Sequence, residues 1–170
     1  MGEAIRAQFA IGYAPDGYAA LKDALGTDPR RMQLLDRAGL FSKNDRGHVY
    51  DKFRDRVMFP IHDRRGRVIA FGGRVLDPDA APKYLNSPET AIYHQGDILY
   101  GLNWSKNAIR RPGSALVVEG YMDYVSLAAH GVENVVAPLG TAMTTQQAQL
   151  LARYTRRVTL LYDSDTAGLK

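Results

Sequence analysis

The sequence predicts an α/β protein of two parts: a mixed α+β subdomain over residues 1–111, then an open parallel-sheet unit over 112–170 that is incomplete at its C-terminal end. After residue 112, three short apolar runs alternate with two helical stretches, a pattern that favours a parallel sheet covered by helices. Before residue 112, two strand-type runs flank a short turn sequence. The chain has 170 residues, of which 45% are hydrophobic, so it is long enough to bury a core.

Two short helices are expected near the start of the chain. The first lies in "DGYAALKDAL", with Asp16 as its N-cap. The second lies in "DPRRMQLLDRAGL", with Asp28 as N-cap, Pro29 at the first helical position and Gly39 as the stop. We expect the polar stretch "SKNDRGH" that follows to be a loop.

The middle of the chain predicts a β-hairpin, because "RVMFPI" and "RVIAFGGRVL" flank the turn sequence "HDRRG". The stretch "LDPDAAPKYLNSPET" is rich in proline and polar residues, so we expect an ordered loop without regular structure. A helix is expected around "ILYGLNWSKNAI", before the break "RRPGS".

The last part of the chain alternates strands and helices. "ALVVEG", "NVVAPLG" and "RVTLLYD" are the expected strands. "YMDYVSLAAHG" is an expected helix that stops at Gly131, and "TTQQAQLLARY" is one capped by Thr144 or Thr145.

Positive charge is concentrated in one segment. The chain has 22 Lys and Arg against 18 Asp and Glu, a net charge of +4. Between Lys43 and Lys83 there are ten basic and six acidic residues, so this segment holds the whole excess. A surface that binds a polyanion requires such a concentration, although a solvated hairpin of mixed charge would show it too.

Carboxylate side chains lie at or just after the predicted ends of two strands of the parallel sheet. Glu119 ends the first strand, Asp163 ends the third, and Asp165 follows two residues later. If the first and third strands are neighbours, the three carboxylates converge, and oxygen-only ligands favour Mg²⁺ or Mn²⁺. The alternative is that "DSD" only caps a helix. Asp123, one helical turn after Glu119, could reach the same patch or face solvent.

Composition also excludes some classes of site and location. There is no cysteine, so disulfides and thiolate metal sites are ruled out and a reducing compartment is expected. No apolar stretch is long enough to cross a bilayer, and the start "MGEAIRAQFAIGYAP" lacks the apolar core of a signal peptide. We therefore expect a cytoplasmic protein without membrane contact.

Several of these stretches carry a family resemblance. "LVVEGYMD" followed by "LLYDSDTAG" resembles the Toprim domain of topoisomerases, primases and related nucleases. "RVMFPIHDRRGRVIAFGGRVL", "PKYLNSPET" and "IGYAP" resemble the RNA-polymerase core of bacterial DnaG-type primase, and the resemblance covers nearly the whole chain. It implies an enzyme that copies single-stranded DNA into short RNA primers, from ribonucleoside triphosphates and with Mg²⁺ or Mn²⁺.

The resemblance also assigns roles to residues. It implies that Glu119, Asp163 and Asp165 are metal ligands at the polymerising site, with Asp123 a further catalytic candidate. It implies a basic surface for template, nucleotide or primer, made of Arg54, Arg56, Arg74, Lys83, Tyr84 and Asn86. Tyr84 could stack on a base or simply pack, and Asn86 could only shape a turn. Gln95 stands where the family commonly has lysine, so a phosphate contact would be lost there.

Finally, the resemblance implies parts beyond this chain. The family's Toprim sheet continues to a further aspartate pair, and a helical subdomain and a helicase-binding domain follow. A zinc-binding domain precedes the core. We therefore expect a partial chain, nucleoid-associated, that contacts the replicative helicase and zinc only through absent domains, and whose own catalysis is weak or lost. The alternatives are a non-catalytic module that binds single-stranded nucleic acid, or another Toprim nuclease or topoisomerase.

Overall fold

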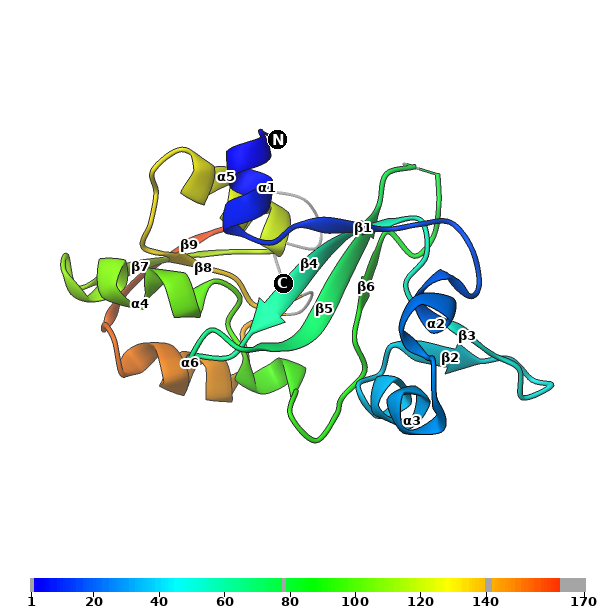
Figure 1. Cartoon of the computed structure of the whole chain (residues 1–170). Coiled ribbons are helices and arrows are strands. Elements are labelled where there is room, and N and C mark those ends of the chain that lie inside the picture. The colour runs from blue at the N-terminus through cyan, green and yellow to red at the C-terminus, as the bar shows by residue number, and fades with distance from the viewer. Residues whose placement is uncertain (1, 78, 140–141, 163–170) are drawn as a thin grey trace. The chain divides into compact units, whose positions relative to one another are not determined.

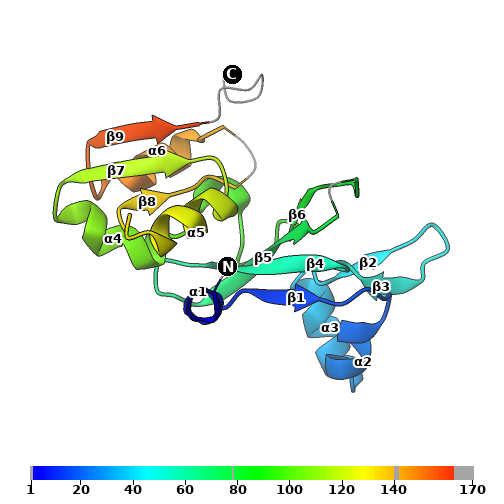
Figure 2. The same ribbon diagram turned by 90° about the horizontal axis from the view of Figure 1, so that it is seen from above.

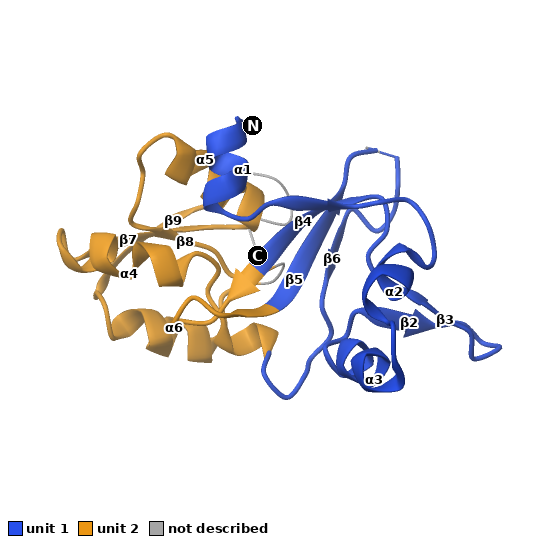
Figure 3. Ribbon diagram, in the orientation of Figure 1, with its two compact units in different colours: residues 1–60, 70–93 blue, residues 61–69, 94–170 orange. Residues whose placement is uncertain are grey.

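The computed structural model describes residues 2–77, 79–139 and 142–162. The chain forms two compact units: unit 1 is Met1–Pro60 with Ala70–Tyr93, and unit 2 is Ile61–Ile69 with His94–Lys170 (Figure 3). The tip of the central hairpin thus belongs with unit 2, although most of both its strands lies in unit 1. A domain boundary between residues 111 and 112 stays a prediction from the sequence.

Unit 1 contains a four-stranded sheet in the order β1-β4-β5-β6. Its strands are β1 (Gly12–Ala14), β4 (Arg56–His62), β5 (Val68–Val75) and β6 (Tyr84–Asn86). The predicted hairpin is confirmed as β4 and β5, whose turn has Gly66 at φ +84°. The expectation of an irregular "LDPDAAPKYLNSPET" is wrong in one place. β6 pairs antiparallel with β5, and only three residues pair, too few to show an alternating pattern.

The helices of unit 1 are α1, α2 and α3, and a second hairpin, β2–β3, lies beside α2 and α3 (Figure 2). Their bounds are α1 (Glu3–Gln8), α2 (Ala20–Leu25), α3 (Pro29–Arg37), β2 (Phe41–Lys43) and β3 (Val49–Asp51). The N-cap of α3 is confirmed, since the Asp28 side chain accepts a hydrogen bond from the Arg31 N–H at 2.9 Å. The expected loop "SKNDRGH" is partly wrong, because its first two residues, Ser42 and Lys43, belong to β2 and pair with β3.

Asp16 does not cap the first predicted helix. Helix α2 begins only at Ala20, and its free N–H groups are satisfied from a distant part of the chain. The buried carboxylate of Asp51 accepts hydrogen bonds from the N–H groups of Leu21, at 2.6 Å, and Lys22, at 3.1 Å. A tertiary cap therefore replaces the local one that the sequence suggested.

Unit 2 contains the parallel sheet that the sequence predicts. Its elements are η1 (Gln95–Asp97), α4 (Leu102–Arg110), β7 (Ser114–Val118), α5 (Tyr121–Ala129), β8 (Val135–Val136), α6 (Thr145–Ala152) and β9 (Arg157–Leu161). The strand order is β8-β7-β9, and both outer strands run parallel to β7. Helix α5 lies on one face of the sheet, and α4 and α6 lie on the other (Figure 1). The first and third strands are neighbours, as expected.

The core of unit 2 lies between this sheet and its helices. It is formed by Leu99, Leu102, Ile109, Ala115, Val117, Val136 and Leu151. Tyr124 of α5 is buried, with its hydroxyl 3.2 Å from Ser105 Oγ of α4. Beside this ring lies Gly101, at φ +83°. A side chain there would overlap the ring, because a Cβ would lie 2.0 Å from Tyr124 Cε2.

Helix α6 is tied at its start to the segment around η1. Thr144 is the N-cap: its hydroxyl accepts from the Gln147 N–H at 3.1 Å and donates to the Gly96 carbonyl at 2.6 Å. The amide of Gln147, a residue only 1% exposed, donates to the carbonyls of Ile98 at 2.8 Å and Gln95 at 3.2 Å. These bonds hold the start of α6 against η1.

None of the helices in the described part of the chain has the length and apolar character needed to cross a membrane.

Candidate functional site

Glu119 lies at the carboxyl end of the central strand of unit 2. It directly follows β7, and because Val118 is opposite Leu161 of β9, Glu119 and Tyr162 are the next pair along the two strands. Burial raises the pKa of the Tyr162 phenol, and the negative charge of Glu119 raises it further. The carboxylate therefore lies close to the end of β9, which leads directly into Asp163.

The other two expected metal ligands, Asp163 and Asp165, lie outside the described residues. In the described ranges no group of three His, Cys, Asp or Glu side chains is placed to hold a metal ion. The donors expected here are all carboxylate oxygens, which suit a hard divalent cation such as Mg²⁺. The assignment of Glu119, Asp163 and Asp165 as its ligands stays a prediction.

Asp123 has a structural role at the start of α5. It is the third residue of that helix, and its Oδ2 accepts a hydrogen bond from the Gly120 N–H at 3.1 Å. This hydrogen bond fixes the turn directly after Glu119, so Asp123 supports the backbone that carries the carboxylate. A catalytic role for Asp123 stays a prediction.

The structure brings most of the expected basic surface together on the sheet of unit 1. We use "basic surface" for five residues on β4, β5 and β6 and just before β6: Arg56, Arg74, Lys83, Tyr84 and Asn86. Arg74 and Tyr84 are opposite each other across β5 and β6. The Arg74 guanidinium lies 5.6 Å from the Tyr84 ring centroid, and Lys83 Nζ lies 6.0 Å from it. Two cations therefore gather at one aromatic ring, which is 46% exposed.

Arg56 is nearly buried, and its position depends on a glycine. Its Nη1 donates to the Pro82 carbonyl at 2.8 Å, which ties β4 to the segment before β6. A Cβ on Gly73 would lie 3.1 Å from both Arg56 Cδ and the ring of Phe53. The glycine therefore permits a close approach, since its bare backbone makes room for the arginine stem.

Two polar atoms of the basic surface are buried without a partner in the described part of the chain. They are Arg74 Nε and Asn86 Oδ1, a donor and an acceptor on adjacent strands. Buried polar groups in folded proteins are nearly always hydrogen-bonded. Arg74 Nε and Asn86 Oδ1 are therefore an unusual pair of unsatisfied buried groups beneath the basic surface.

Arg54 is held apart from these contacts. Its guanidinium lies 4.4 Å from the ring centroid of Tyr18 and 5.0 Å from that of Tyr50, and its Nη1 donates to the Asp51 carbonyl at 2.8 Å. Sequence analysis missed both tyrosines, because they are far apart in the chain and belong to no pattern. Their rings and Arg54 form a cation–π group next to the N-terminal cap of α2.

Gln95 has a role that the sequence did not suggest. Its side-chain amide donates to the Leu139 carbonyl, and its own carbonyl accepts from Gln147. The residue therefore ties η1 to the exit of β8. This contact shows what the glutamine does, and it leaves the predicted loss of a phosphate contact untested.

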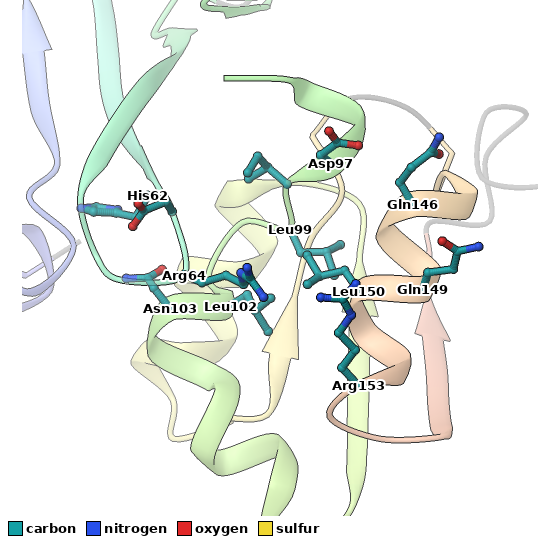
Figure 4. A pocket seen from close by; sticks show the side chains of 12 residues that line it. His62, Arg64, Asp97, Leu99, Leu102, Asn103, Gln146, Gln149, Leu150 and Arg153 are labelled. Carbon is teal, nitrogen blue, oxygen red and sulfur yellow. The ribbon is translucent and has the colours of Figure 1, made fainter. Parts of the chain in front are cut away.

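Sequence analysis also missed a hollow of about 370 Å³ in unit 2, between the hairpin tip, α4 and α6 (Figure 4). Its apolar lining comes from Ile98 and from three leucines, Leu99, Leu102 and Leu150. Polar side chains surround these leucines, with Arg64 from the hairpin tip and Arg153 from the end of α6 (Figure 4). No local pattern signals this hollow, because its sides come from three separate parts of the chain.

Comparison with known families divides the chain in two. Residues 1–106 match the N-terminal domain of the DNA primase catalytic core, and residues 116–170 match a Toprim-like domain. The DNA primase of Escherichia coli K12 is 53% identical over 162 residues, which cover 95% of this chain and 28% of that protein.

Solved structures agree with this result. A DNA primase domain from Pseudomonas aeruginosa superposes with a TM-score of 0.92 at 48% identity, over 99% of this chain and 52% of that one. A DnaG primase catalytic domain bound to single-stranded DNA superposes with a TM-score of 0.89 at 50% identity, with the same coverage. The chain thus spans about half of these solved domains and 28% of the curated relative. This chain belongs to the family of DnaG-type bacterial DNA primase catalytic cores.

Proposed function

We propose that this chain is part of a DNA-directed RNA polymerase, which synthesises short RNA primers on a single-stranded DNA template from ribonucleoside triphosphates. The observation that carries the proposal is Glu119 at the carboxyl end of β7, beside the end of β9 that leads into Asp163. In open parallel sheets, functional groups gather at this edge. Family membership supports the choice of nucleotidyl transfer.

In this proposal Glu119, Asp163 and Asp165 hold Mg²⁺ or Mn²⁺. When bound, the ion supplies Lewis-acid stabilisation of the transferring phosphoryl group and of the leaving pyrophosphate. The reaction forms a bond from the primer 3′-oxygen to the α-phosphorus of the incoming nucleotide. The bond to pyrophosphate breaks, and the hydroxyl loses its proton. Three converging carboxylates would repel each other without a cation, so they suit this role.

The basic surface holds the phosphates of template, nucleotide or primer. Arg74 and Lys83 neutralise phosphate charge without reading sequence. The half-exposed ring of Tyr84 offers a face on which a base can stack.

The partners of the whole enzyme follow from the same proposal. A primer-forming enzyme acts beside the replicative helicase, so we propose that relatives of full length contact the helicase and zinc through further domains. Its template is chromosomal DNA, which places the protein in the cytoplasm at the nucleoid.

The test is template-dependent incorporation of labelled ribonucleotides with Mg²⁺ or Mn²⁺, by the chain and its Glu119→Gln variant. We expect incorporation to fall by roughly two to three orders of magnitude, as when one charged stabiliser of a transition state is removed. The matched control is Glu133→Gln, the same change at an exposed acid of unit 2, which should leave incorporation unchanged. Measurable incorporation that is equal in wild type and Glu119→Gln would refute the assigned role.

A second candidate function is a module that binds single-stranded nucleic acid without catalysis. The complete basic surface within the described residues favours it, because that surface needs no metal. Such a module should show no incorporation, and its affinity for single-stranded DNA should not fall in Glu119→Gln. Incorporation that depends on Glu119 would exclude it.

A further inference from the structure

A second group of cations lies in unit 2, and it includes none of the residues assigned to the polymerising site or to the basic surface. We call it the tip cluster: Arg64, Arg65 and Arg67 at the tip of the β4–β5 hairpin, with Lys106 and Arg110 of α4. Together with Asp63 and Tyr154 these residues line a hollow of about 550 Å³. The proposed polymerase function uses none of them.

The hairpin tip is fixed by its one carboxylate. Asp63 accepts hydrogen bonds from the backbone N–H groups of Arg65, at 2.8 Å, and Arg67, at 3.0 Å, and from Arg67 Nε at 2.7 Å. These bonds, with that to the Arg67 backbone the strongest influence, hold the pKa of Asp63 at about 2. The carboxylate therefore stays ionised, and its oxygens accept hydrogen bonds from within the turn.

Helix α4 is fixed to the same tip. Lys106 Nζ donates to the Arg64 carbonyl at 3.1 Å. The Arg110 guanidinium lies 4.7 Å from the ring centroid of Tyr154. The cations of two separate elements are thus held around one hollow by specific contacts.

Little negative charge balances this cluster. Among the described residues Arg67 is its only member with an ion pair, to Asp63. Arg64, Arg65 and Arg110 are exposed. Because several cations lie around one hollow, an anion that enters it is attracted by all of them at once.

The lining favours the backbone of a nucleic acid over a single nucleotide. Six of its seven residues are charged, and the one aromatic ring, Tyr154, is already covered by Arg110. Among the described residues that line it there is no aliphatic side chain of Leu, Ile or Val on which a base could rest. The smaller hollow of Figure 4 shares Asp63 and Arg64 with this one and adds Asp97 and Arg153, so one further cation is available to a backbone phosphate beyond the tip cluster.

We propose that the tip cluster binds backbone phosphates of a single-stranded nucleic acid, as a contact additional to the basic surface of unit 1. The proposal rests on the proposed function only for the choice of a single strand as ligand. Guanidinium groups suit this role because their planar fork matches phosphate.

The experiment measures binding of fluorescein-labelled oligothymidylate to the 170-residue chain by anisotropy, over a series of salt concentrations and with ATP as a competitor. The test variant carries Arg64→Gln, Arg65→Gln and Arg110→Gln. The control variant carries Arg6→Gln, Arg30→Gln and Arg156→Gln, three exposed arginines outside both surfaces with the same loss of charge. A third variant replaces the test arginines by lysine. Circular dichroism and thermal melts establish that each variant is folded.

If three phosphate contacts are lost, the slope of log K against log salt should become less steep by about 2, and affinity near 0.1 M salt should fall roughly 100-fold. The control should bind like wild type, and the lysine variant should keep most of the slope. An unchanged slope in the test variant, or the same loss in the control, overturns the proposal. Loss of ATP competition without loss of oligonucleotide binding also overturns it, in favour of a nucleotide site.

Failure of the tip-cluster proposal can be distinguished from failure of the proposed polymerase function. A test variant that binds like wild type refutes the tip cluster and leaves Glu119-dependent incorporation standing. Incorporation that survives Glu119→Gln refutes the polymerase assignment, and the salt slopes still decide the tip cluster. A wild-type chain that does not bind the oligonucleotide refutes the tip cluster as well.

Discussion

The contact between Gly101 and Tyr124 predicts a large loss of stability for Gly101→Ala. At φ +83° an alanine is strained by about 1–2 kcal/mol. In addition, its Cβ would lie 2.0, 2.4 and 2.6 Å from three ring carbons of Tyr124, a buried residue whose hydroxyl is hydrogen-bonded to Ser105. Displacing a packed ring adds about 1–3 kcal/mol. We therefore expect a loss of about 2–5 kcal/mol in the free energy of unfolding.

The matched control is Gly131→Ala, in the same unit. Its φ is +85°, and a Cβ there would have no atom within 4 Å. This variant should lose only the strain of about 1–2 kcal/mol. Urea denaturation gives both values, and thermal melts should show a fall of about 2–4 °C for each kcal/mol.

Equal losses in the two glycine variants would refute this reasoning, because the ring contact would then contribute nothing. A second comparison uses a Tyr124→Leu background, in which a smaller aliphatic side chain replaces the ring. In that background Gly101→Ala should lose no more than Gly131→Ala, because the two changes act through one contact.

Three further predictions concern a cap, a titration and a binding residue. Asp28→Ala removes the hydrogen bond to the Arg31 N–H, so urea denaturation should show a loss of about 1 kcal/mol. The pKa of Asp63 is about 2, below the ordinary value, so its hydrogen bonds stabilise the folded state above about pH 4 and this contribution is lost as pH falls to about 2. Asp63→Asn should therefore be less stable than wild type at neutral pH, and the difference should shrink across that window in acid titrations; a difference independent of pH would contradict it. Arg74→Gln should weaken binding of single-stranded DNA of every sequence and make the salt slope less steep by about 0.7, whereas a sequence-dependent loss would argue against a phosphate contact.

Elements with local signals were predicted correctly from the sequence. Helix α3 has its cap, its proline and its stop within one short stretch, and the β4–β5 hairpin has two strand-type runs around one turn. The parallel order β8-β7-β9 follows from alternation and short connections. In each case the residues that determine the element are neighbours in the chain.

Elements that depend on distant residues were not predictable in this way. Helix α2 takes its cap from Asp51, about thirty residues away, so a local search chose Asp16 instead. Strand β6 is defined by its pairing with β5, and its three residues carry no pattern of their own. Such elements exist because of tertiary contacts, which override local propensity.

The same difference between local and distant signals applies to the candidate site. Charge counting along the chain indicated a basic segment, and the strand ends indicated Glu119. Counting did not separate Arg74, which lies at a half-exposed ring, from Arg54, which is enclosed by Tyr18 and Tyr50. Nor did it show that arginines of the same segment divide between two compact units. That division depends on how the long hairpin folds, and charge does not encode it.

The bonds that tie α6 to η1 determine how the hollow of Figure 4 can adapt to a ligand. Because Thr144 and Gln147 hold the Gly96 and Ile98 carbonyls, the side of the hollow built from η1 and α6 should resist widening. The opposite side is the hairpin tip, whose arginines are solvated and whose backbone bonds are mostly local. A bulky guest would therefore be accommodated by the arginines of the tip changing rotamer, while the helical side acts as a rigid template. Amide hydrogen exchange should reveal this asymmetry, with slow exchange at Gln147, whose N–H is bonded to Thr144, and faster exchange at Arg64.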